Sequence, residues 1–230
     1  MDDYTKLLLH CDGVDGSTTF TDSSRFGQVV TVQSNAQIDT AVQKFGTGSC
    51  LLDGNSDYLT IPASGYMQLG AGDWTLEMQV KFNNLDKKQQ MFHRYTANNN
   101  ELQFNINSEN RLYMYMYANS AYQFYYYTGA DTINDANWHH VVFVRNGNTP
   151  YIFVDGVSQN LTTHTAFSGA LSDINSVLYM GVSTYNSTLQ KYFDGYMDEI
   201  RISIGLARWT ENFTAPTKSY NLIKGINGVY

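Results

Sequence analysis

Tyrosine is the residue type best placed to do chemistry in this sequence, with 18 copies in 230 residues, and two short runs concentrate it. In residues 111–117 and 121–127 the tyrosines alternate with other side chains, as expected of β-strands with one buried and one solvent-facing side. If the two runs pair as neighbouring strands, one sheet surface collects five rings: Tyr113, Tyr115, Tyr117, Tyr125 and Tyr127. The opposite faces carry Leu112, Met114 and Met116 from the first run and Tyr122, Phe124 and Tyr126 from the second.

Such a tyrosine surface is suited to more than one ligand. Flat rings stack on the C–H faces of sugars, and their hydroxyls hydrogen-bond to sugar hydroxyls. Exposed aromatic surface is equally typical of contacts between protein chains. Tyrosine is also a good strand former, so an ordinary sheet surface is a third interpretation.

Acidic residues offer a second candidate chemistry. In residues 196–204, alternation puts Asp198 on the same side as three isoleucines. If that side faces the core, an unpaired carboxylate would cost several kcal/mol, so Asp198 requires a partner. Glycoside hydrolysis would need two carboxyl groups roughly 5–9.5 Å apart around one substrate. Glu77 is alone in its run, and Asp198 and Glu199 should point to opposite faces. We therefore expect no enzymatic activity.

Histidine and cysteine do not form a metal-binding or catalytic pattern. His139 and His140 are adjacent in a strand, so their side chains diverge and cannot chelate one metal ion. The two cysteines, Cys11 and Cys50, are too few for a zinc site. They are either two buried thiols or a single disulfide bridge.

Period-two alternation dominates the chain and predicts the elements that position these residues. Residues 74–82 alternate apolar and polar side chains, which indicates a half-buried strand. Residues 138–160 contain Asn146-Gly147 and Asp155-Gly156, whose positive φ angles favour tight hairpins and a three-stranded meander. A helical turn is expected near Leu206. Further strands are predicted at 7–11, 50–52, 58–61, 91–95, 102–106, 111–117, 121–127, 177–181 and 193–204.

Composition limits the class of protein. Apolar residues make up 43 % and charged residues 15 %, which fits one folded domain, here residues 1–219, with a C-terminal tail at 220–230 that contacts a partner. The net charge is −7 without a basic block, which disfavours nucleic acid as a ligand. Neither a spanning segment of about 20 apolar residues nor a signal peptide is recognisable. We expect no membrane partner.

Several motifs resemble those of one family. They run in the order LLHCDG at 8–13, FTDSS at 20–24, FGTGSCLLDG at 45–54, DYLTI at 57–61, DWTLE at 73–77, WHHV at 138–141, FVDG at 153–156 and FDGYMDEIRI at 193–202. This series is similar to the laminin G-like jelly-roll branch of the concanavalin A-like lectin/glucanase superfamily. The resemblance covers roughly residues 6–215 and departs at Cys11, where an aromatic is common. It implies an all-β fold of two antiparallel sheets.

The resemblance also implies a metal and a setting. Related glucanases hold a structural calcium with an aspartate in the last strands, which carries over to Asp198, with Asp12 in reach if the terminal strands are neighbours. The alternative is that Asp198 binds backbone N–H groups or an arginine. The glucanase string Glu-x-Asp-x-x-Glu is absent.

The ending ARWTENFTAP at 207–216 resembles such domains in bacteriophage virion proteins. We therefore expect a virion tail or capsid-decoration protein, homo-oligomeric or attached to a larger assembly, that contacts host-surface glycan, other virion proteins or both. The alternatives are a carbohydrate-binding module of a bacterial adhesin or glycan-degrading enzyme, and a purely structural cement protein.

Overall fold

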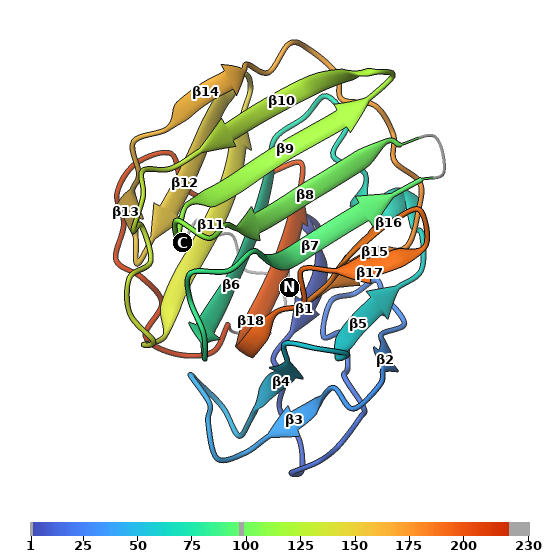
Figure 1. The fold of residues 1–230 in the computed structure, drawn as a ribbon, viewed down its shortest axis with the longest axis vertical. Helices are drawn as coiled ribbons and strands as arrows, with labels where there is room; N and C mark the ends of the chain where they lie inside the picture. The colour runs from blue at the N-terminus through green and yellow to red at the C-terminus, as the bar shows by residue number, and fades with distance from the viewer. Residues whose placement is uncertain (1, 97–98, 221–230) are drawn as a thin grey trace.

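The computed structural model describes residues 2–96 and 99–220, which form two large β-sheets packed face to face (Figure 1). Sheet A has the order β13 (Val157–Ser158), β12 (Thr149–Val154), β11 (His139–Asn146), β6 (Trp74–Phe82), β18 (Asp194–Ile204), β4 (Ser49–Asp53) and β3 (Gln37–Asp39), and β1 (Thr5–Leu9) also pairs with β18. Sheet B has the order β14 (Thr162–Thr165), β10 (Ala121–Tyr127), β9 (Leu112–Ala118), β8 (Glu101–Ile106), β7 (Gln89–Tyr95), β15 (Leu178–Met180), β5 (Tyr58–Ile61) and β2 (Thr31–Gln33). The prediction of an all-β, two-sheet jelly roll is confirmed.

Two smaller elements complete the described part of the chain. A hairpin of β16 (Ser183–Tyr185) and β17 (Thr188–Gln190) stands apart from both sheets and contacts β7. The helical content of the described residues is the single 3₁₀ turn η1 (Gly65–Met67). None of these residues forms a helix long and apolar enough to cross a membrane.

The core lies between the two sheets and follows from the alternation in their strands. Trp74, fully buried at the start of β6, packs its ring edge-on against Phe104 of β8 and against Phe167. The Leu112, Met114 and Met116 side of β9 is buried as well. Cys11 and Cys50 are both buried and free, which agrees with the interpretation as two thiols.

The meander of β11, β12 and β13 forms as expected, with one change at its first turn. Asn146 pairs with Thr149, so the turn centres on Gly147 and Asn148 and Asn146 is the last strand residue. Gly147 alone supplies a positive φ there, of 59°. At the second turn Asp155 and Gly156 adopt the positive φ angles that the sequence predicted, 51° and 80°.

The segment after β18 covers the outer surface of sheet A. Trp209 and Phe213 stack with ring centroids 4.3 Å apart and pack on a small apolar cluster of Val142, Val144 and Phe153. The expected helical turn near Leu206 is therefore wrong: the Leu206 carbonyl accepts a hydrogen bond from Thr75 Oγ1 of β6 (3.0 Å), and no helix forms there.

The covering segment extends further than the sequence indicated. Tyr220, which the prediction assigned to the tail, donates its hydroxyl to Glu77 (2.6 Å) and its backbone N–H to Glu199 Oε2 (2.8 Å). Tyr220 thus contacts two side chains of sheet A, and the boundary between the domain and the tail stays a prediction. Residues 221–230, the remainder of the predicted tail, lie outside the described residues.

Candidate functional site

The five tyrosines singled out in the sequence share the outer surface of sheet B. In the register of β9 and β10, Tyr115 lies opposite Tyr125 and Tyr113 opposite Tyr127. Tyr113, Tyr115 and Tyr117 are half-buried while the residues between them are fully buried, so the tyrosines point away from the core. The grouping expected from alternation is confirmed, and its role stays a prediction.

A sixth ring, Tyr122, joins this group, although the sequence placed it on the opposite face. The register of β10 shifts between Tyr122 and Phe124, and such a bulge reverses which side a residue faces. The centroid of the Tyr122 ring lies 5.1 Å from that of Tyr117 and 5.0 Å from that of Tyr125, and Tyr122 is 38 % exposed. We call the six residues Tyr113, Tyr115, Tyr117, Tyr122, Tyr125 and Tyr127 the tyrosine patch.

One side of the tyrosine patch opens into a cavity of about 350 Å³. Polar groups from the segment before β9 and from β14 line this cavity, and those of β14 were not expected because this short polar strand shows no alternation. The Arg111 guanidinium lies 5.8 Å from the Tyr127 ring and forms an ion pair with Glu109, and His164 lies 5.0 Å from Tyr125. The lining residues are Glu109, Arg111, Tyr113, Tyr125, Tyr127, Thr162 and His164.

The hydroxyls of Tyr115 and Tyr125 are neutral hydrogen-bonding groups. Burial and the neighbouring hydroxyls raise the pKa of Tyr125 to about 12. Burial and the adjacent Glu101 raise the pKa of Tyr115 as well, and the Tyr115 hydroxyl donates to Glu101 Oε1 (3.1 Å). Burial opposes ionisation of Glu101, but the nearby His93 (3.8 Å) and hydrogen bonds from Gln103 and Tyr115 outweigh it and lower the pKa of Glu101. Glu101 is therefore an ionised acceptor that fixes one ring of the patch.

Asp12 and Asp198, the two predicted calcium ligands, both hold the loop at residues 44–47. Asp198 Oδ2 accepts hydrogen bonds from the N–H groups of Lys44 (3.1 Å) and Phe45 (3.0 Å). Asp12 Oδ1 accepts from the N–H and the hydroxyl of Thr47. Burial raises the pKa of Asp198 to about 7, against the opposing effect of its N–H partners.

This arrangement tests how well the residues fit calcium. The partners of Asp198 are N–H donors, whereas calcium takes six to eight oxygen ligands. Within 2–96 and 99–220, no three His, Cys, Asp or Glu side chains are grouped to hold a metal ion. The geometry matches the alternative named from the sequence, a carboxylate bound to backbone N–H groups. Calcium stays a prediction.

Asp198 does not lie on the core side, and a bulge is again the reason. Asp198 pairs with Gln79 and Arg201 pairs with Glu77, so one extra residue is inserted between the two pairs. Glu199, at φ 47°, takes up the irregularity. Asp198 therefore shares the outer side of sheet A with Gln79 while Ile200 is in the core. Glu199 reaches the same outer side, where it contacts His10 (2.8 Å).

Glu77 occupies the centre of a buried polar cluster on the outer side of sheet A. Its Oε1 accepts from Arg201 Nε (2.6 Å), and its Oε2 lies 3.1 Å from His140 Nε2 and 2.6 Å from the Tyr220 hydroxyl. Burial would raise the pKa of Glu77, but Arg201 and His140 lower it to about 2. Glu77 is fully buried. The carboxylate acts as an ion-pair partner, covered by the C-terminal segment.

Comparison with known proteins places this fold. The family model described as "Concanavalin A-like lectin/glucanases superfamily" matches residues 53–206. No curated protein sequence matches the chain. Among solved structures, the fold is similar to the binding domain of Paraclostridial mosquitocidal protein 1 (14 % identity, TM-score 0.65), covering 96 % of this chain and 50 % of that one.

Two further solved structures are similar at the level of the fold. Domain 4 of AbnA, an extracellular arabinanase of Geobacillus stearothermophilus in complex with arabinotriose, has 18 % identity and a TM-score of 0.64 and covers 88 % of this chain and 93 % of that one. A structure of botulinum neurotoxin type C, a toxin whose cell entry depends on two ganglioside molecules, has 12 % identity and a TM-score of 0.64. The match covers 96 % of this chain and 49 % of that one. The chain thus spans about half the length of the toxin structures.

Proposed function

Because the chain belongs to the concanavalin A-like lectin/glucanases superfamily, we propose that it is a non-catalytic module that binds glycan on the tyrosine patch. The observation that carries the proposal is the grouping of six tyrosine rings on one sheet surface beside a cavity of about 350 Å³. Small-molecule sites typically enclose about 300–1,000 Å³.

The patch matches sugar chemistry in both of its components. Tyr113 and Tyr127 stack nearly parallel, with centroids 5.1 Å apart, and offer an aromatic platform for the C–H face of a sugar ring. Arg111, His164 and the tyrosine hydroxyls provide donors and acceptors at its rim. Domain 4 of AbnA matches this fold over 93 % of its own length, and its structure is a complex with arabinotriose. This similarity supports a glycan as the ligand.

The state of the carboxylates supports a module without catalysis. A glycosidase needs two carboxyl groups that reach one substrate. Glu77 and Glu199 are both buried and are bridged by Tyr220, whose hydroxyl binds Glu77 and whose N–H binds Glu199. In this arrangement their oxygens serve the domain's own side chains.

The biological setting we propose is a bacteriophage particle, where the module contacts host-surface glycan, other virion proteins or both. The proposal rests on the similarity of residues 207–216 to the ending of such domains in virion proteins. An assembly of several copies, or attachment to a larger structure, would multiply a weak sugar contact. A carbohydrate-binding module of a bacterial adhesin or glycan-degrading enzyme uses the same surface and is the second candidate.

A glycan array probed with the purified chain tests the proposal. We expect reproducible binding of at least one glycan that is lost in the double variant Tyr115→Ala and Tyr125→Ala and weakened in Tyr122→Ala. Tyr66→Ala, which removes a tyrosine that is 60 % exposed outside the patch, is the matched control. A blank array would contradict the proposal and favour a structural cement protein. Release of reducing sugar would contradict the non-catalytic part.

A further inference from the structure

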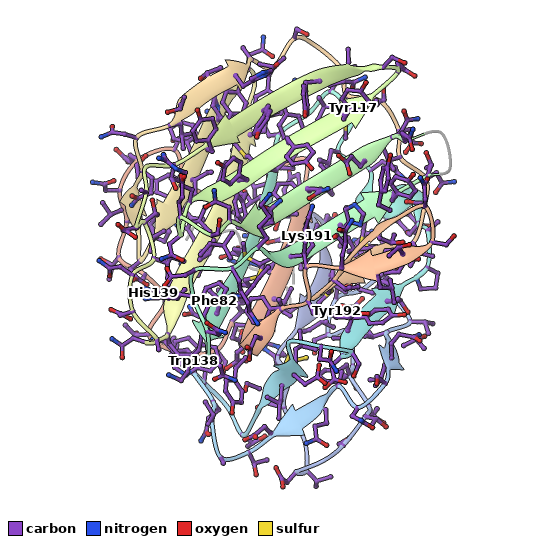
Figure 2. All side chains as sticks on the ribbon, in the orientation of Figure 1. Phe82, Tyr117, Trp138, His139, Lys191 and Tyr192 are labelled. Atoms are coloured by element: carbon purple, nitrogen blue, oxygen red, sulfur yellow. The ribbon has the colours of Figure 1, made fainter. Side chains whose placement is uncertain are left out.

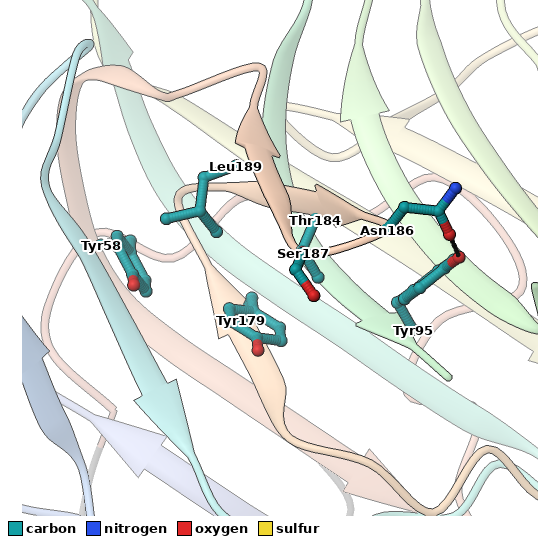
Figure 3. A pocket seen from close by; sticks show the side chains of 7 residues that line it. All are labelled: Tyr58, Tyr95, Tyr179, Thr184, Asn186, Ser187 and Leu189. Carbon is teal, nitrogen blue, oxygen red and sulfur yellow. Dashed lines mark hydrogen bonds between the residues drawn. The ribbon is translucent and has the colours of Figure 1, made fainter. Parts of the chain in front are cut away.

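A second cavity, of about 670 Å³, opens between the other end of sheet B and the β16–β17 hairpin (Figure 3). It is lined by Tyr58, Tyr95, Tyr179, Thr184, Asn186, Ser187 and Leu189. We propose that this cavity is a second glycan subsite, specific for uncharged sugar; the inference rests on the proposed function and extends it to a site separate from the tyrosine patch.

Three neighbouring strands supply the aromatic part of the cavity. Tyr58 belongs to β5, Tyr179 to β15 and Tyr95 to β7, which lie side by side in sheet B. The rings of Tyr58 and Tyr179 are 6.1 Å apart. The ring of buried His93 lies between those of Tyr179 and Tyr95, 6.4 Å from the first and 6.2 Å from the second. The row of rings resembles the tyrosine patch in composition and offers stacking surface for a sugar ring.

The hairpin supplies the polar part. Asn186 and Ser187 form its tip, both with positive φ (48° and 63°), and this turn directs them to the rim of the cavity. The Tyr95 hydroxyl donates to Asn186 Oδ1 (2.9 Å) and so holds the hairpin tip against sheet B. With Thr184 of β16, the rim presents hydroxyl and amide groups, the donors and acceptors that sugar hydroxyls require.

Charge separates this cavity from the one beside the tyrosine patch. All seven of its lining side chains are uncharged. The patch cavity instead contains Glu109, Arg111 and His164. Because an anionic sugar entering the second cavity would lose water without meeting a cation among the lining residues, the site favours a neutral saccharide.

The two sites are parts of one sheet surface. Glu101 of β8 lies between them, with Tyr115 of the patch bound to Oε1 (3.1 Å) and His93, which backs the cavity, 3.8 Å from Oε2. Gln103, two residues after Glu101 in β8, accepts a contact from Lys191 (3.4 Å). Figure 2 shows Lys191 between Tyr117 and Tyr192. Glu101, Gln103 and Lys191 thus form a polar strip between the two sites, and a glycan can occupy either site separately.

The test is isothermal titration calorimetry of the chain with neutral trisaccharides (maltotriose, cellotriose, mannotriose and arabinotriose) and with 3′-sialyllactose. We expect a neutral trisaccharide to bind about tenfold more weakly to Tyr179→Ala than to the wild-type chain, whereas the control Tyr66→Ala, outside both sites, should bind it like the wild type. Asn186→Gly suits the positive φ of the turn and removes only the side-chain contact, so it gives the same loss without risk to the core.

The outcomes separate the two proposals. If Tyr179→Ala and Asn186→Gly bind as the wild type does while the patch variant loses binding, the second subsite is wrong and the glycan-binding function stands. If sialyllactose binding depends on Tyr179, the assignment to neutral sugar is wrong. If the wild-type chain binds no saccharide in either the array or the calorimeter, both proposals fall.

Discussion

Replacing Glu77 by glutamine should destabilise the domain strongly, because the isosteric amide removes the charge of a fully buried carboxylate that pairs with Arg201. Arg201, whose side chain is 14 % exposed, lies 2.6 Å from Glu77 and would keep its charge without a counter-ion. Because the amide has one oxygen instead of two, either Arg201 or the pair of His140 and Tyr220 would also lose its hydrogen-bond acceptor. The shape of the side chain is retained, so the change reports on charge and hydrogen bonding.

The expected size follows from the burial of both partners. Removing one partner of a buried pair costs about 3–5 kcal/mol. For a domain of this size, 1 kcal/mol shifts the melting temperature by about 2–4 °C, so the variant should melt roughly 6–20 °C lower. The pKa of Glu77 is about 2 in the folded chain and 4.5 ordinarily, so its stabilisation is present above pH 4.5 and is lost as the pH falls through 2.

Thermal unfolding followed by circular dichroism at pH 7 and at pH 3 measures the effect, with Glu109→Gln at the exposed Arg111 pair as control. We expect no measurable change in the control, and a wild-type advantage over Glu77→Gln that narrows at pH 3. A difference of about 2 °C corresponds to a loss of no more than about 1 kcal/mol. A Glu77→Gln protein that melts within this range of the wild type would refute the reasoning. The ion pair of Glu77 would then contribute little to the stability of the domain.

Three further outcomes are expected. Asp198 has a pKa of about 7 in the folded chain against an ordinary 3.8, so its protonated form stabilises the fold below pH 3.8. This stabilisation is lost as the pH rises through 7, a change of about 4 kcal/mol. In Asp198→Asn the midpoint of urea unfolding should therefore change less between pH 4 and pH 8 than in the wild type, and an equal change in both proteins would contradict the pKa shift. If calcium binds at Asp12 and Asp198, chelator lowers the melting temperature and added calcium restores it, whereas an unaltered temperature excludes the ion as a stabiliser. Tyr220→Phe loses a hydrogen bond to a charged group worth about 1.5–3 kcal/mol, so limited proteolysis should cut the segment after β18 faster, and equal cutting rates would oppose this.

Long alternating runs made much of the fold predictable. The pattern at 74–82 coincides with β6, and the runs at 58–61 and 121–127 coincide with β5 and β10. Five short strands were not expected: β2, β3, β14, β16 and β17. Each has only three or four residues, and pairing with other strands defines them more than their own sequence does.

The site was predictable only where alternation is unbroken. It correctly grouped the tyrosines of β9, but it misplaced Tyr122 and Asp198, because each lies next to a bulge that shifts the strand by one residue. No side chain in the sequence marks either bulge. The second cavity was equally out of reach, since Tyr58, Tyr95 and Tyr179 come together only through the strand order of sheet B.

The contacts of Asp2 and Tyr220 have a practical consequence for handling the domain. Asp2 pairs with Arg208 (2.6 Å) and Tyr220 binds Glu77, so both ends of the described chain are fastened on the outer side of sheet A. The tyrosine patch lies on the outer side of sheet B, with the core between. A tag, sensor surface or fusion partner joined directly before Asp2 or directly after Tyr220 would lie on the side of sheet A and leave the aromatic surface of sheet B free to meet its ligand.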